Sequence, residues 1–175
     1  MTALPSRFLR ALHSDRPAPD RADAMGPYGF LIGSWEMDTV LHLDDGTTRR
    51  DRGEIHAGWV LEGRALQDVW IIPSVFYGTT LRVYDPGRDA WHILWIDPVM
   101  QFYPRQIGRA RGMDIVQIGA GDDGATLRWS FREIARDSFT WRAERSFDGG
   151  ETWQLQAEFR ARRMEGNAGC VVQGD

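Results

Sequence analysis

The chain has 175 residues, of which 42% are apolar and 26% are charged, and its formal net charge at pH 7 is −4. This length suits one domain, and no apolar run approaches the roughly 18 residues of a membrane helix. All 21 basic residues are arginines, scattered along the chain and outnumbered by 25 acidic residues. We therefore expect neither a membrane nor a nucleic acid as partner, and the absence of lysine excludes Schiff-base and pyridoxal-type catalysis.

The termini and the cysteine content indicate a cellular compartment. Arg7 and Arg10 alternate with apolar residues instead of preceding an apolar block, so we expect no signal peptide. The single cysteine, Cys170, cannot form an intramolecular disulfide and has no histidine beside it. These features predict a reducing cytoplasmic location. The use of arginine in place of every lysine is typical of a GC-rich bacterial genome.

Residues 1–27 predict a short N-terminal helical segment followed by a linker. Ser6 is a suitable N-cap for the amphipathic stretch at residues 8–12, and Pro17 and Pro19 prevent its continuation. At the other end, residues 164–175 predict a flexible tail.

Residues 28–163 predict an all-β domain. Runs of β-branched and aromatic residues are separated by turn sequences at intervals of about 8–15 residues, which is typical of meandering antiparallel strands. Because no long helix is available to cover the apolar face, we expect the sheet to close into an up-and-down barrel of about 8–10 strands, with a β-sandwich as the alternative. The expected turns are Asp44–Thr47, Glu62-Gly63, Asp85–Arg88, Gly119–Gly124, Arg136–Ser138 and Asp148–Gly150.

Three motifs carry a family resemblance. Gly33-Ser34-Trp35, a Gly-x-x-x-x-x-Tyr-Asp strand that begins at Gly78, and Trp95-Ile96-Asp97 occur in this order. The chain thereby resembles the calycin superfamily of lipocalins, fatty-acid-binding proteins and nitrobindins, and is most similar to uncharacterised bacterial lipocalin-like domains. The resemblance implies that Trp35 opens the first barrel strand and closes one barrel end. It also implies that an arginine of the last strand packs on this indole, with Arg160, Arg162 and Arg163 as the candidates.

The resemblance does not extend to haem. Nitrobindin-like haem binding requires a histidine late in the barrel, whereas His92 is the last histidine of this chain. The sequence also has no HExxH, Cys-x-x-Cys or glycine-rich phosphate loop, so we predict neither a cofactor nor a metal.

The segment from Ser146 to Trp153 is similar to the Asp-box of sialidase propellers. A single copy indicates structure and not catalysis. We expect a tight hairpin in which Asp148 accepts hydrogen bonds from turn amides while Trp153 packs beneath it.

Asp68 is a carboxylate on an otherwise apolar face of two predicted strands. If Glu62-Gly63 is a two-residue turn, Asp68 shares one sheet face with Trp59 and Trp70. A buried carboxylate needs a donor or a raised pKa, which makes Asp68 a candidate acid, base or ligand anchor. The alternative is a structural ion pair with an arginine such as Arg82.

The turn at Asp85–Arg88 permits two registers. One aligns Thr80, Arg82 and Tyr84 with Trp91, Ile93, Trp95 and Asp97, whereas a shift by one residue brings His92 beside Arg82. We favour the first register because it keeps the aromatic row continuous. The predicted catalytic residues are Asp68, Arg82 and Asp97, and the predicted ligand-binding residues are Trp59, Trp70, Tyr84, His92, Trp95, Trp129 and Trp141.

Three functions fit these residues. The favoured one is a carrier that binds a small, partly apolar organic molecule inside an aromatic-lined barrel. The second is a cofactor-independent isomerase, cyclase, dehydratase or lyase in which Asp68 or Asp97 moves a proton and Arg82 stabilises negative charge. The third is an interaction domain with a filled barrel that forms a homodimer through exposed strand edges.

Overall fold

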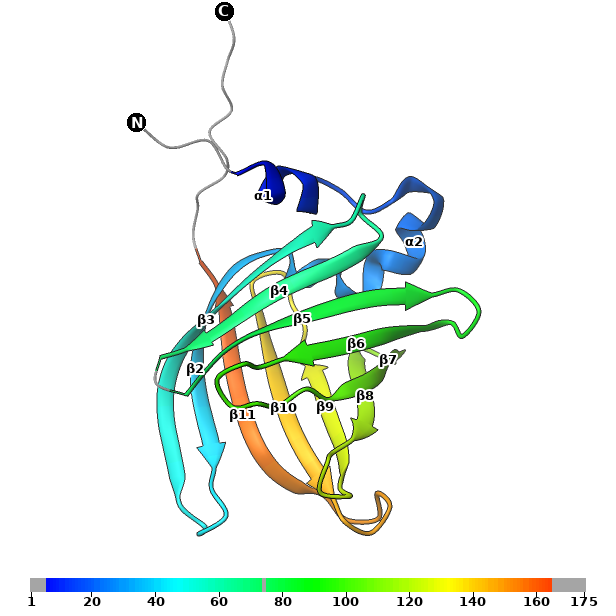
Figure 1. Cartoon of the computed structure of the whole chain (residues 1–175). Helices are drawn as coiled ribbons and strands as arrows, with labels where there is room; N and C mark the ends of the chain where they lie inside the picture. The colour runs from blue at the N-terminus through cyan, green and yellow to red at the C-terminus, as the bar shows by residue number, and fades with distance from the viewer. Residues whose placement is uncertain (1–5, 74, 165–175) are drawn as a thin grey trace, which may run out of the picture.

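The computed structural model describes residues 6–73 and 75–164, so the predicted tail, including Cys170, lies outside it from residue 165 onward. Within these ranges the chain forms a closed barrel of ten antiparallel strands, β2 to β11, in which each strand pairs with the next and β11 pairs with β2. Figure 1 shows this barrel with the helical segments gathered at one end. The prediction of an all-β, up-and-down barrel is confirmed, and the closed strand order excludes a β-sandwich.

The elements follow one another along the chain in a simple order. The helical elements are α1 (Arg7–Leu12), η1 (Pro19–Arg21), α2 (Ala22–Met25) and η2 (Gly26–Leu31), with η marking 3-10 helices. The strands are β1 (His13–Ser14), β2 (Gly33–His42), β3 (Thr48–Val60), β4 (Ala65–Ile72), β5 (Phe76–Asp85), β6 (Ala90–Ile96), β7 (Arg105–Arg111), β8 (Asp114–Ala120), β9 (Thr126–Arg132), β10 (Ser138–Ser146) and β11 (Gln154–Arg163). The short β1 pairs with β3 outside the barrel. No helix of the described ranges is long and apolar enough to cross a membrane.

The N-terminal segment contains more helix than the sequence predicts, and part of it is buried in the barrel core. The Ser6 hydroxyl accepts the Leu9 N–H at 3.3 Å, so α1 begins where expected, but none of its residues is buried. After Pro17, η1, α2 and η2 form a run of helical turns that extends past residue 27, and Met25, Tyr28 and Leu31 in this run are fully buried. These side chains recur every three residues, the spacing that aligns side chains in a tight 3-10 turn. They belong to the barrel core, and the helical segment that carries them lies at one end of the barrel (Figure 1).

Trp35 fixes this closed end, as the resemblance implies. Its indole N–H donates to the Leu31 carbonyl at 2.8 Å, and the Arg163 guanidinium lies 4.0 Å from its ring centroid. The same guanidinium donates to the carbonyls of Ile32 and Phe30 at 2.7 and 3.0 Å. Of the three candidate arginines, Arg163 is therefore the partner. Arg163 thereby connects β11 to both β2 and η2.

Both predicted registers are confirmed. Strands β3 and β4 pair Ala57 with Asp68, and β5 and β6 pair Arg82 with Ile93. His92 pairs with Val83 and so faces away from the interior row that contains Arg82. The Asp-box also has the expected form, because Asp148 accepts the backbone N–H groups of Glu151 and Thr152 at 3.0 and 2.9 Å.

Candidate functional site

The barrel contains a cavity of about 600 Å³ that opens at the end opposite η2. Its lining includes Leu43 of the β2–β3 turn, Val75 of the β4–β5 loop and Met100 of the β6–β7 loop. In an up-and-down barrel these connections all lie at one end, whereas the segment that precedes β2 lies at the other. The volume is in the range of pockets that hold drug-sized molecules, about 300–1,000 Å³.

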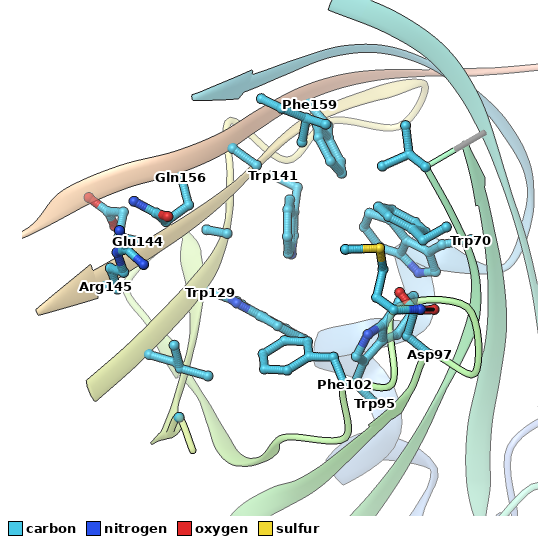
Figure 2. Close-up of a pocket in the computed structure, with 18 of the residues that line it drawn as sticks. Trp70, Trp95, Asp97, Phe102, Trp129, Trp141, Glu144, Arg145, Gln156 and Phe159 are labelled. Carbon is cyan, nitrogen blue, oxygen red and sulfur yellow. Dashed lines mark hydrogen bonds between the residues drawn. The ribbon is translucent and has the colours of Figure 1, made fainter. Parts of the chain in front are cut away.

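A belt of aromatic rings forms the cavity wall, as Figure 2 shows. Trp141 is at its centre, with ring centroids 4.9 Å from Phe159, 5.3 Å from Trp70 and 5.6 Å from Trp129. Trp95 continues the belt at 6.3 Å from Trp129. These rings come from β4, β6, β9, β10 and β11, so barrel closure brings together residues that lie far apart in the sequence.

Gly78 makes room for one ring of this belt. A Cβ atom at this position would lie 2.4 Å from Cζ2 of Trp95, closer than real Cβ contacts come. The Trp95 ring therefore approaches β5 where only glycine leaves space. This contact gives a physical reason for two of the motifs that carry the family resemblance.

Asp68 and Arg82 form an ion pair inside the barrel, and both side chains are at most 2% exposed. Asp68 accepts the Thr80 N–H at 3.1 Å through Oδ1 and the Arg82 Nη1 through Oδ2. The guanidinium also lies 5.3 Å from the ring centroid of Tyr28 and 5.7 Å from that of Phe131. Arg82 lines the cavity and Asp68 does not, so the pair presents its cationic partner to a ligand. Burial also raises the pKa of the Tyr28 phenol, so this hydroxyl stays protonated.

Asp97 shapes the cavity mouth. Its Oδ1 atom accepts the N–H groups of Val99 and Met100, each at 3.0 Å, and the side chain is buried. These bonds fold the β6–β7 loop so that Met100 and Phe102 join the cavity lining. These two residues lie in a loop that has no strand or helix periodicity, so the sequence pattern gives no signal for them.

The structure places three predicted ligand-binding residues outside the cavity lining. Trp59 lies at the closed end, where its ring approaches Gly29 of η2. Tyr84 turns its hydroxyl to Asp89 at 2.8 Å. Alternation along a strand identifies the interior face but not the depth along the barrel, and η2 fills the interior beside Trp59.

His92 is the third of these residues, and its exclusion follows from the register. Its Nε2 atom lies 3.0 Å from Oδ2 of Asp85 on the outer face of the barrel. This hydrogen bond lowers the pKa of Asp85. His56, the other histidine expected within a strand, contacts Ser34 and Glu54 and likewise does not line the cavity, whereas His42 at the end of β2 does.

Charged residues at the mouth enter the lining through an irregularity in β10. The pairing with β11 shifts between Ala143 and Glu144, and Ala143, Glu144 and Arg145 all line the cavity. Glu144 accepts two hydrogen bonds from Arg128, at 2.8 and 2.9 Å. Regular alternation cannot predict this set, since a bulge breaks the period of two.

Comparisons with known proteins identify the fold. No protein-family model matches the chain, and no curated protein matches it. Among solved structures, Rv2717c from M. tuberculosis aligns with a TM-score of 0.59 and 14% identity over 85% of this chain and 99% of the other. The S-type phycobiliprotein lyase CPES from Guillardia theta aligns with a TM-score of 0.55 and 11% identity over 93% and 99%. The likeness shows a lipocalin-like barrel fold.

Proposed function

We propose that this protein binds a small, partly apolar organic molecule inside its barrel. The observation that carries the proposal is the aromatic-lined cavity of about 600 Å³, open at one end. A chain whose barrel served only as an interaction domain would gain stability by filling this space with side chains. One structural neighbour is named a lyase and the other has no activity in its name, so the likeness favours neither a carrier nor an enzyme.

Titration with N-phenyl-1-naphthylamine, an uncharged aromatic probe, tests the proposal. We expect saturable quenching of tryptophan emission as the probe enters the aromatic belt. Ala143→Phe adds a ring to the cavity lining and should weaken binding at least tenfold. Ala135→Phe makes the same change at an exposed loop position and should leave the affinity unchanged. Absence of saturable binding, or equal affinity of both variants and the original chain, contradicts the proposal.

The alternative is a cofactor-independent enzyme that uses Asp68, Arg82 and Asp97. It has less support, because both carboxylate oxygens of Asp68 already accept hydrogen bonds and Asp68 does not reach the cavity. Incubation with a metabolite extract, followed by mass spectrometry, distinguishes the two functions. A carrier depletes a component without a new product, whereas an enzyme yields a product that Asp97→Asn abolishes. The kinship with bacterial lipocalin-like domains, the cytoplasmic location and the homodimer stay predictions.

A further inference from the structure

We infer that the ligand is a flat, uncharged aromatic molecule that carries several hydrogen-bond acceptors, such as a polycyclic ketone or quinone. This inference rests on the proposed function and names its ligand class. It follows from three properties of the cavity wall: its unmet donors, its charge and the shape of its surface.

Several residues of the wall carry donors that have no acceptor. The indole N–H of Trp70 and the Nε–H of Arg82 are buried and have no hydrogen-bond partner within the described part of the chain. Trp35 and Trp153 are the tryptophans whose indole N–H donates to a described residue, and neither of them lines the cavity. None of the four indoles of the cavity belt therefore donates a hydrogen bond to a residue that the structure describes.

Unused donors determine what a ligand must supply. A buried N–H group without an acceptor is unfavourable, so a molecule that brings acceptors to these groups gains affinity. A simple hydrocarbon or the chain of a fatty acid covers the rings but leaves the donors unmet. Carbonyl, ether or aromatic nitrogen acceptors on the ligand skeleton satisfy both requirements.

The charges of the site favour acceptors without a formal charge. The Arg82 cation is already neutralised by Asp68, which holds it in a buried ion pair. Asp97 adds a carboxylate to the lining, and within the described residues no arginine or histidine lies within ion-pair distance of it. An anionic group deep in the cavity would therefore meet the Asp97 carboxylate, while the charge of Arg82 is already balanced by Asp68.

The wall presents flat ring faces and edges. Trp141 is stacked on Phe159 with 30° between the ring planes, and Trp70 and Trp129 meet Trp141 at 57° and 62°. Figure 2 shows these rings around the open space of the cavity. A planar, conjugated molecule makes stacked contacts with some of these rings and edge contacts with others, which a flexible chain cannot match.

A matched pair of uncharged probes tests the acceptor requirement. 2-(Hydroxymethyl)anthraquinone and 2-(hydroxymethyl)anthracene share a three-ring skeleton and differ in two carbonyl groups. We expect the quinone to bind at least tenfold more tightly in titrations followed by tryptophan fluorescence and by calorimetry. Anthraquinone-2-carboxylate should bind more weakly than the uncharged quinone, and tighter binding of the carboxylate overturns the charge assignment.

Two variants test the role of the indole donors. Trp70→Phe and Trp129→Phe each keep an aromatic ring and remove one N–H group, so each should reduce the preference for the quinone while anthracene binding changes little. Trp153→Phe removes an indole outside the cavity and should leave the preference intact. Circular dichroism checks folding, and Trp129, which is half-buried, preserves the test if Trp70→Phe does not fold.

The outcomes distinguish a failure of the proposed ligand class from a failure of the proposed binding function. If no probe of the set binds, and N-phenyl-1-naphthylamine also fails, the proposed function itself is wrong. If both three-ring probes bind with equal affinity, or if the preference survives in Trp70→Phe and Trp129→Phe alike, the cavity binds ligands but the donor argument is wrong.

Discussion

Replacement of Arg82 by methionine removes one partner of the ion pair that lies inside the barrel. The Asp68 carboxylate would then keep a single hydrogen bond, from the Thr80 N–H, at a position that is 1% exposed. Removal of one partner from a buried ion pair costs about 3–5 kcal/mol, against a total stability of about 5–15 kcal/mol for a typical domain. In a chain of this size each kcal/mol lowers Tm by about 2–4 °C, so we expect a loss of about 6–20 °C.

Urea unfolding followed by tryptophan fluorescence measures this loss. Arg162→Met serves as the control, because Arg162 pairs with Asp38 on the surface, where the two side chains are 61% and 50% exposed. Its cost should be at most about 1 kcal/mol. The double variant Asp68→Leu with Arg82→Met should be more stable than Arg82→Met alone, since no unpaired charge remains. A cost below about 1 kcal/mol for Arg82→Met, or a double variant less stable than the single one, refutes this reasoning.

Three further predictions concern the closed end, the aromatic belt and the Asp-box. Arg163→Leu should lower the free energy of unfolding, measured in urea, by about 2 kcal/mol. Arg163→Lys should restore little of this loss, because an ammonium cannot stack on Trp35 while it donates to two carbonyls. Full recovery of stability with lysine contradicts this account. Gly78→Ala should cost about 1–3 kcal/mol and weaken probe binding, since the added methyl group displaces Trp95; unchanged affinity argues against it. Hydrogen bonds from Ser146 and Thr152 hold the pKa of Asp148 well below its ordinary value of 3.8. The contribution of Asp148 to stability is therefore present above about pH 4 and decreases as the pH falls further, and unfolding curves of Asp148→Asn should lack this part of the acid dependence.

Much of the barrel was predictable from the sequence because its determinants are local. Turn residues such as those at Asp85–Arg88 set the register between adjacent strands, and the period of two then fixes which side chains face inward. The pairing of Asp68 with Arg82 and the interior position of Trp95 and Trp141 follow from these rules. The sequence also limited the arginine that packs on Trp35 to three candidates in the last strand, one of which is Arg163.

Only the tertiary structure decided how deep each interior residue lies. Trp59 and Trp70 share a face and a residue type, yet one packs against η2 and the other lines the cavity. The difference comes from the segment that contains Tyr28, which packs into the core at the closed end of the barrel. Sequence periodicity describes one strand at a time, whereas the depth of a side chain depends on which distant segment occupies the space opposite it.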